Sequence, residues 1–332
     1  MNSIERYVNC IEGKRIDCLP RIPIVMQFAA EYIGSNYASF ASNHQILVRA
    51  NSRCTDDFSF DQLSAISDPY RETQGFGAEI EYPLNHVPRC KNPPLENSFD
   101  LSLLKKPNPF ESERMADRIH AIQLFYEKFK NRYSIMGWVE GPAAEAATLR
   151  SVNNFFVDLL LNPSFSNELM DICTDVSIDF TKAQIDNGAD TIGIGDAVAS
   201  QVSPHVYEKM IQPREKRIVE AIHRMGAFVR LHICGNISHL LNGIADLGVD
   251  ILDVDHMVSM KEARKVMGDR TVLSGNIDPV HGILRGTPVK IKEYILKTYE
   301  EVGNPFMVNA GCEIPSGTPN ENLRALCEPI AF

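Results

Sequence analysis

The sequence has no long apolar run and fewer basic than acidic residues, and each of these shortages excludes a class of protein. Apolar stretches such as Phe155–Leu161 are interrupted by a charge, here Asp158, and none approaches the roughly 18–20 residues of a membrane span. The net charge is −10, from 33 Lys and Arg against 43 Asp and Glu, which is unfavourable for general nucleic-acid binding. The predicted partners therefore include neither a membrane nor a nucleic acid.

Signals of several other classes are also missing. The sequence shows no tandem repeat, no low-complexity tract and no Gly-x-Gly-x-x-Gly motif after a strand, which argues against repeat architectures and a dinucleotide-binding sheet. Met1–Arg6 lacks the basic-then-apolar layout of a secretion signal, so a cytoplasmic location is expected. In that compartment the 8 Cys are not expected to form a disulfide framework.

What the sequence does contain is a series of short apolar segments that end in small or polar residues. Such segments are typical of strands that are buried on both faces of a parallel sheet. The eight predicted strands are Arg21–Gln27, Gln62–Ser67, Ser134–Glu140, Thr191–Asp196, Ala227–Ile233, Asp250–Asp255, Thr271–Gly275 and Phe306–Gly311.

Helical periodicity separates most of these strands. The predicted helices are Glu113–Lys130, Asn167–Asn187, Tyr207–Met225, Ile237–Leu247, Met260–Met267 and Val289–Val302. Alternation of strands and helices implies right-handed βαβ units, and eight strands favour an α/β fold of the (β/α)8 TIM-barrel type over a doubly wound sheet. We interpret residues 1–332 as one barrel domain with extra N-terminal helical elements, and Pro83–Pro109 as a long excursion over one face.

Polar residues stand at or just after the ends of the predicted strands, where barrel enzymes place their catalytic groups. They are Gln27, Asp68, Glu140, Asp196, His232-Ile233-Cys234, Asp253-Val254-Asp255-His256, Asn276, and Asn309 with Cys312. This convergence is the most informative functional signal in the sequence.

A candidate metal site stands out among these strand ends. His232 and Cys234 are two residues apart, so in an extended segment their side chains point the same way. Closing the barrel brings Cys312, after the eighth strand, towards the same mouth. One His and two Cys are a familiar zinc set that leaves a fourth position open to a substrate. The alternative is a hydrogen-bonded core histidine and two buried thiols.

Several motifs resemble those of a known family. They are Gly141-Pro142, Gly188-Ala189-Asp190, Ser274-Gly275-Asn276-Ile277-Asp278-Pro279, His232-x-Cys234, and Gly311-Cys312 followed by Thr318-Pro319-x-Glu321-Asn322-Leu323. Over roughly residues 1–330 the chain resembles the uroporphyrinogen decarboxylase superfamily, and within it the zinc-dependent, corrinoid-linked methyltransferases. The resemblance implies an α/β barrel, Zn²⁺ held by His232, Cys234 and Cys312, and a corrinoid (cobalamin) cofactor. Because the chain has no Asp-x-His-x-x-Gly corrinoid-binding motif, a separate corrinoid protein is the expected partner.

The resemblance disfavours the porphyrin-decarboxylating branch of the superfamily. That branch carries arginines near the first strand for the substrate carboxylates, whereas Met26–Tyr32 contains none. Asp68 does match an aspartate that the branch uses, so the residue is interpreted as retained for another role.

The favoured function is methyl transfer from a small donor to the cobalt of the corrinoid protein. The donor would be a methyl ether, such as an aryl O-methyl compound, or a molecule of the methanol or methylamine type. Glu140 and Glu145 favour this direction, because they give an acidic character that resembles the methyl-donor enzymes. The alternatives are transfer from methylcobalamin to a thiol of the coenzyme M type, decarboxylation of uroporphyrinogen, and an inactive scaffold barrel.

Three carboxylates are the candidate catalytic residues. Glu140 is predicted to be an exchangeable fourth zinc ligand or the acid that protonates a departing oxygen, with a paired strand-end carboxylate as the alternative. Asp255 is the rival fourth ligand, or else it holds the His232 ring through a hydrogen bond. Asp196 is predicted to contact substrate or a neighbouring site residue, with a helix cap as the alternative.

Four further strand-end residues are predicted to bind substrate: Gln27, Asp68, Asn276 and Asn309. For Asn276 the alternative is a structural role in the turn that continues into Asp278-Pro279.

Overall fold

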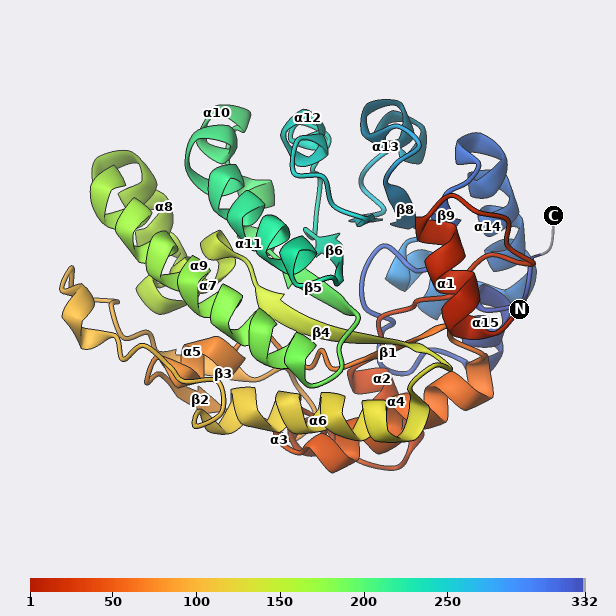
Figure 1. Ribbon diagram of the computed structural model, residues 1–332, viewed down its shortest axis with the longest axis horizontal. Helices are drawn as coiled ribbons and strands as arrows, with labels where there is room; N and C mark the ends of the chain where they lie inside the picture. The colour runs from red at the N-terminus through yellow and green to blue at the C-terminus, as the bar shows by residue number, and fades with distance from the viewer. Residues whose placement is uncertain (331–332) are drawn as a thin grey trace.

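The structure is a computed structural model that describes residues 1–330 (Figure 1). Its centre is a curled parallel sheet in the order β1-β4-β5-β6-β7-β8-β9. The strands are β1 (Gln62–Ser64), β4 (Ser134–Glu140), β5 (Thr191–Gly195), β6 (Phe228–His232), β7 (Ile251–Val254), β8 (Val272–Gly275) and β9 (Phe306–Met307). Every residue of β4, β5, β7 and β8 is buried, as the apolar segments predicted for strands covered on both faces.

Helices lie outside the strands (Figure 1). Those before β1 are α1 (Ser3–Ile11), α2 (Gln27–Tyr32), α3 (Tyr37–Ser42) and α4 (His44–Phe58), which confirms the extra N-terminal helical elements. The later α-helices are α5 (Arg71–Gly75), α6 (Glu113–Phe129), α7 (Pro142–Arg150), α8 (Val152–Leu161), α9 (Pro163–Asp186), α10 (Pro204–Val206), α11 (Gln212–Arg224), α12 (Leu241–Ala245), α13 (Met260–Met267), α14 (Pro288–Val302) and α15 (Asn320–Leu326). Short 3-10 and π turns are η1 (Leu101–Leu103), η2 (Ala197–Gln201), η3 (Tyr207–Ile211) and η4 (Pro279–Leu284).

The predicted first strand, Arg21–Gln27, is wrong as a strand. Its pairing is reduced to one isolated parallel bridge between Arg21 and Val308. Pro20 and Pro23 have no backbone N–H, so the segment cannot donate the regular ladder of hydrogen bonds that a strand needs. Gln27, expected at the end of this strand, is instead the first residue of α2.

The same segment nevertheless fills the eighth position of the barrel. On one side the Ile22 N–H donates to the Val308 carbonyl (2.9 Å), and on the other the Asp61 N–H donates to the Arg21 carbonyl (2.8 Å). The buried Asp61 carboxylate also accepts hydrogen bonds from the Arg21 backbone and guanidinium and pairs with Arg6 of α1. Extended backbone and an ion-pair cluster therefore link β9 to β1, and the predicted TIM-barrel fold is confirmed.

Two other predicted strands are shorter than expected. Gln62–Ser67 pairs only over Gln62–Ser64, and Phe306–Gly311 only over Phe306–Met307, after which Val308 and Ala310 each form a single bridge. The excursion at Pro83–Pro109 contains β3 (Arg89–Asn92), which pairs antiparallel with β2 (Glu79–Glu81) just before the excursion, and the turn η1. No helix within residues 1–330 is long and apolar enough to cross a membrane.

The register of the sheet places the strand ends level with one another. Glu140 on β4 pairs with Gly195 on β5, Gly195 pairs with His232 on β6, and His232 pairs with Asp253 on β7. These residues form one row across neighbouring strands at the carboxyl end of the sheet. The row fixes the positions of the polar side chains described next.

Candidate metal centre and its pocket

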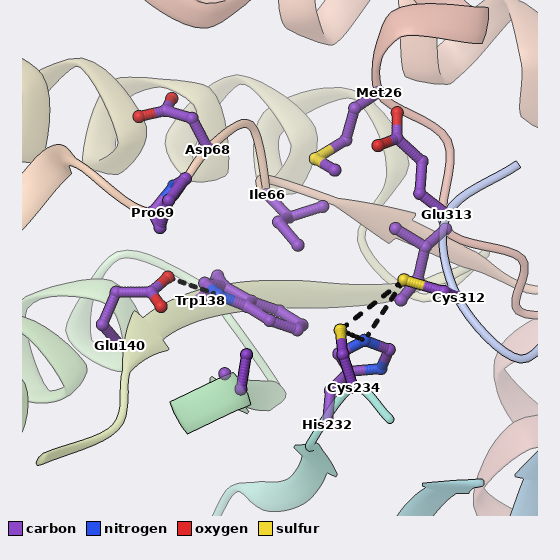
Figure 2. Close-up of a pocket in the computed structure, with 13 residues that line it drawn as sticks. Met26, Ile66, Asp68, Pro69, Trp138, Glu140, His232, Cys234, Cys312 and Glu313 are labelled. Atoms are coloured by element: carbon purple, nitrogen blue, oxygen red, sulfur yellow. Dashed lines mark hydrogen bonds between the residues drawn. The ribbon is translucent and has the colours of Figure 1, made fainter. Parts of the chain in front are cut away.

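Three side chains from distant parts of the chain converge at the mouth of the barrel (Figure 2). The His232 Nε2 atom lies 3.1 Å from the Cys234 Sγ atom and 3.6 Å from the Cys312 Sγ atom. The two sulfurs lie 3.7 Å apart. Within residues 1–330 these three residues are the one group of at least three His, Cys, Asp or Glu side chains whose donor atoms lie close enough together to hold a metal ion.

The separations fit a tetrahedral metal ion. Zn–S and Zn–N bonds of about 2.3 and 2.0–2.1 Å place tetrahedral ligands about 3.8 Å apart for two sulfurs and about 3.6 Å apart for sulfur and nitrogen. The sulfur–sulfur and Cys312–His232 distances match these values, while the Cys234–His232 pair is closer. One imidazole and two thiols also have the donor chemistry that zinc prefers.

Asp253 sets the orientation of the His232 ring. Its Oδ2 atom lies 3.1 Å from His232 Nδ1, which leaves Nε2 to face the two sulfurs. The Asp253 carboxylate also accepts a hydrogen bond from Arg230 Nε (2.9 Å) and one from Asn309 Nδ2 (3.4 Å). The sequence analysis considered Asp255 for this contact, but Asp253 makes it, because the register pairs His232 with Asp253.

The three side chains of this group shift one another's pKa values. Hydrogen bonding from the Cys234 thiol lowers the pKa of Cys312 to about 4, and the same contact raises the pKa of Cys234. Burial opposes protonation of His232, but the charge on the neighbouring sulfur and the hydrogen bond to Asp253 raise its pKa well above the ordinary value. Metal binding to this group therefore displaces protons from His232 and Cys234.

A cavity opens next to the three donors. Its atom-free space is ≈ 590 Å³, part of it open to solvent, which is a size that suits a small molecule. The lining residues are Ile24, Met26, Ile66, Asp68, Pro69, Trp138, Glu140, Gly195, Ala197, His232, Cys234, Cys312 and Glu313.

Trp138 forms one wall of the cavity and was given no role in the sequence analysis. A Cβ atom on Gly193 would lie 2.2 Å from Trp138 Cε3, and one on Gly195 would lie 2.9 Å from Cζ2. The two glycines of β5 therefore provide the space that the indole ring occupies. The Trp138 Nε1–H donates a hydrogen bond to Glu140 Oε1 (3.0 Å), two residues further along β4.

Glu140 lines the cavity but does not belong to the converging donors. Its Oε1 atom accepts hydrogen bonds from Trp138 and from Arg71 Nη2 (2.8 Å), and its Oε2 atom has no hydrogen-bond partner in the described part of the chain. Burial raises the pKa of Glu140 to about 8, although the Arg71 charge opposes the shift. The side chain is therefore a carboxyl that gains or loses a proton near neutral pH.

Asp68 is the second carboxylate at this end of the cavity. It forms an ion pair with Arg114 and accepts hydrogen bonds from the Ser67 hydroxyl (2.6 Å) and the Tyr70 N–H (3.0 Å). Burial disfavours the charge, but Arg114 and then Arg71 outweigh it and lower the pKa of Asp68. Asp68 is thus a charged residue of the cavity wall, and its role in substrate binding stays a prediction.

Asp196 does not line the cavity, although its neighbours Gly195 and Ala197 do. Its carboxylate is fully buried and accepts hydrogen bonds from the N–H groups of Ala143 (3.2 Å) and Ala144 (2.7 Å), in the first turn of α7. The contacts are those of a helix cap, the alternative considered for this residue, but the capped helix is α7 rather than the segment that follows Asp196.

Asp255 and Asn276 contact backbone groups near the mouth. Asp255 accepts hydrogen bonds from the N–H groups of Gly235 (2.9 Å) and Met257 (3.0 Å). The Asn276 Nδ2 atom donates to the carbonyls of Asp255 and Val258. Both residues build turns, and neither lines the cavity.

Gln27 and Asn309 also lie outside the cavity lining. The Gln27 side chain donates to Glu31 and to the Asn85 carbonyl, while its backbone N–H donates to Glu313 Oε1 (2.9 Å). Glu313, which the sequence analysis missed, lines the cavity directly after Cys312. Its position beside a predicted ligand was the signal that could have identified it.

A buried cluster of carboxylates stands behind Glu140. Glu72 accepts the Glu140 N–H (3.0 Å) and pairs with Arg71 (3.5 Å), and Glu145 accepts a hydrogen bond from the Thr73 hydroxyl (2.9 Å). Burial raises the pKa of both Glu72 and Glu145. The single Arg71 guanidinium therefore faces more carboxylates than it can neutralise, and the cluster retains protons.

The substitution Glu145→Gln is expected to make folding less sensitive to rising pH. Burial and the charge of Glu72 raise the pKa of Glu145, so the folded protein keeps a proton that the unfolded chain loses above about pH 4.3. The resulting stabilisation is present in acid and is lost as pH rises through the raised value. Glutamine mimics the protonated form, so the fall in unfolding free energy between pH 5 and pH 8 should shrink by on the order of 1 kcal/mol.

Urea unfolding at the two pH values measures this effect. The matched control is Glu168→Gln, because Glu168 is an exposed carboxylate of α9. An identical pH dependence in the Glu145→Gln variant and the wild type would contradict the prediction.

A parallel barrel with a His-Cys-Cys donor set at the carboxyl ends of its strands has the layout of a barrel enzyme with a metal-binding active site. Comparison with known proteins defines it further. Residues 2–331 match the family described as uroporphyrinogen decarboxylase (URO-D), and the chain belongs to this family.

The relatives include enzymes of two activities. The chain is 28% identical over 331 residues to the methylcobamide:CoM methyltransferase MtbA of Methanosarcina acetivorans, covering 98% of this chain and 96% of the relative. It is 27% identical over 345 residues to the uroporphyrinogen decarboxylase of Prochlorococcus marinus, covering 98% and 96%. A solved methyltransferase from Methanosarcina mazei superposes with a TM-score of 0.90 at 25% identity, covering 98% of this chain and 97% of that one.

These matches confirm the resemblance seen in the sequence. The chain is an enzyme of the methyltransferase branch of the family, with the fold of a solved member along almost its whole length.

Proposed function

We propose that this protein is a zinc methyltransferase that moves a methyl group from the cobalt of a methylcobamide to a small thiol. The observation that carries the proposal is the convergence of His232, Cys234 and Cys312 at tetrahedral separations beside a cavity. The printed names of the relatives, methylcobamide:CoM methyltransferases, support this direction over the methyl-donor direction that the sequence analysis favoured. We further propose that the whole chain works as one barrel domain and receives the corrinoid on a separate protein.

His232, Cys234 and Cys312 would hold the zinc ion. Zinc bound there lowers the pKa of a thiol and so keeps a thiolate nucleophile available at neutral pH. Asp253 orients the His232 ring through Nδ1, and Trp138 excludes water from one side of the cavity. Glu140 contacts the part of the substrate that lies away from the ligands, and Asp68 stands behind it in an ion pair with Arg114.

The reaction balances without an oxidant or a reductant. The substrate sulfur forms a bond to the methyl carbon, the cobalt–carbon bond of the methylcobamide breaks, and its electron pair remains on cobalt. The thiol proton leaves to solvent, and the products are a methyl thioether and the cob(I)amide.

One observation favours the methyl-donor direction as a second candidate. Glu140 lines the cavity with a pKa raised to about 8, so it holds a proton at neutral pH that a departing oxygen of a methyl ether could accept. The position of Glu140 on β4, with β5 between it and His232, allows a substrate to lie between the acid and the ligands.

Decarboxylation of a porphyrinogen fits the cavity poorly. Such a substrate carries many carboxylates, whereas the described lining contains Asp68, Glu140 and Glu313 and no lysine or arginine. An inactive scaffold barrel would have no need of a converging donor set beside an open cavity.

Methyl transfer from methylcobalamin to thiols, with zinc-loaded and zinc-free protein, tests the proposal. With zinc-loaded protein we expect loss of the methylcobalamin absorbance and a methyl thioether detected by mass spectrometry. Zinc-free protein should give neither. Production of methylcobalamin from cob(I)alamin and an aryl methyl ether would favour the second candidate. Release of carbon dioxide from uroporphyrinogen, without thiol methylation, would overturn the proposal.

A further inference from the structure

The cavity has two chemically different ends. Figure 2 shows His232, Cys234 and Cys312 at one end, Asp68 and Glu140 at the other, and Trp138 with Ile66 between them. The sheet register agrees, because Glu140 and His232 lie in one row with β5 between their strands. Strands about 4.8 Å apart place the two backbones about 10 Å from each other. A small molecule whose sulfur faces the donors therefore extends its other end towards the two carboxylates.

The carboxylate end offers no positive charge to a ligand. The nearest guanidiniums belong to Arg71 and Arg114, whose side chains are 0% and 2% exposed. Both stand behind the carboxylates that they pair with, Glu140 and Asp68, and neither lines the cavity. A sulfonate or carboxylate placed here would face Glu140 with no positive charge in contact.

Glu140 has hydrogen-bonding capacity left for a ligand. The residue is 6% exposed, lines the cavity, and holds Arg71 and Trp138 with Oε1 alone, while Oε2 is without a partner among residues 1–330. Oε2 is not one of the buried atoms left without a partner, so it is accessible from the cavity and can accept a hydrogen bond from a ligand or water. The π face of an indole such as that of Trp138 also attracts cations.

We infer that the substrate of this enzyme is a small aminothiol, whose ammonium group binds at the Oε2 atom of Glu140, and that thiols with an anionic end are excluded. The inference rests on the proposed thiol-methylating function and specifies its substrate class. It separates this chain from the relatives named for CoM, since coenzyme M is a thiol that ends in a sulfonate. The same fold and the same zinc ligands would then bind a thiol whose other end is positive rather than negative.

Three thiols that differ only in the headgroup provide the test. They are 2-aminoethanethiol, 2-mercaptoethanol and 2-mercaptoethanesulfonate, and their binding to zinc-loaded protein is measured by calorimetry without any corrinoid. We expect the aminothiol to bind about tenfold more tightly than the hydroxyl compound, and the sulfonate at least about tenfold more weakly than the hydroxyl compound. Methylation rates with methylcobalamin should follow the same order.

The outcomes separate the inference from the proposed function. A sulfonate that binds as tightly as the aminothiol overturns the inference, while methylation of that sulfonate would leave the proposed function standing. The expected order of binding without methylation of any thiol supports the headgroup assignment and overturns the proposed function. Absence of binding by all three thiols overturns both.

The variant Glu140→Gln tests whether Glu140 causes the preference for an aminothiol. It keeps an oxygen for Arg71 and Trp138 but cannot lose a proton to become the carboxylate that pairs with a bound ammonium, so the preference for 2-aminoethanethiol over 2-mercaptoethanol should fall about tenfold. Glu168→Gln, which removes an exposed carboxylate of α9, should keep the wild-type preference. An unchanged preference in Glu140→Gln would overturn the assignment, and the wild-type comparison remains decisive if this variant does not fold.

Discussion

Replacing Cys312 by serine is expected to remove stoichiometric zinc binding and methyl transfer together. Cys312 supplies one of two sulfurs, and its Sγ atom lies 3.7 Å from Cys234 and 3.6 Å from His232 Nε2. Serine offers a harder, more basic oxygen that zinc does not favour in such a set. Metal affinity should fall by at least about 100-fold, because loss of a direct ligand exceeds the 10–100-fold loss typical of a residue that only orients a ligand.

Elemental analysis of protein dialysed against a metal buffer measures the zinc content. Cys90→Ser is the matched control, because Cys90 is half-buried on β3 and has no place among the converging donors. It should retain the metal content of the wild type. One zinc ion per chain in the Cys312→Ser variant would contradict the proposed ligand set.

The substitution Asp253→Asn should damage both metal binding and folding. Asp253 is 1% exposed and carries the negative charge that pairs with Arg230, itself 1% exposed, and orients His232. The charge of Arg230 holds the pKa of Asp253 down at about 2 although burial opposes it. Leaving Arg230 buried without its partner should lower the free energy of unfolding by about 3–5 kcal/mol. Metal affinity should fall about 10–100-fold, since the ring orientation is lost.

Urea unfolding and competition with a metal chelator measure the two effects separately. The matched control is Asp246→Asn, which neutralises an exposed aspartate after α12 and should change neither quantity. Wild-type metal affinity in a folded Asp253→Asn variant would show that Asp253 does not orient the ligand.

Most of the strands and the donor trio were predictable, the strands from their local apolar pattern and the trio from its place at strand ends. His232 ends β6 and Cys234 follows it by two residues, so an extended chain places both on one side, and barrel closure brings Cys312 to the same mouth. The helices Met260–Met267 and Glu113–Phe129 were similarly readable from their apolar period.

Contacts that depend on register were not predictable from the sequence. Asp253 and Asp255 are two residues apart, so alternation gives both the same direction and cannot tell which one meets His232. The pairing of β6 with β7 decides for Asp253. In the same way, the first apolar segment has the composition of a strand, but Pro23 removes a donor and the segment closes the barrel without forming one.

The charge of the cavity lining also could not be predicted from the sequence. Arg71 and Arg114 are close to the carboxylates in space, yet their pairing with Glu140 and Asp68 spans long distances in the chain. Only the folded arrangement shows that these guanidiniums face away from the ligand space.

The common row of Glu140, Gly195 and His232 sets the distance between the two ends of the cavity. One residue of each end, Glu140 on β4 and His232 on β6, lies on a strand of the same sheet, with β5 between them. Hydrogen bonding across a sheet fixes this spacing, so motion of the surrounding loops can widen the opening without altering the span from headgroup to sulfur. Discrimination between thiols by chain length should therefore stay the same when the loops move. Acceptance of branched thiols should instead depend on the conformation of the loops.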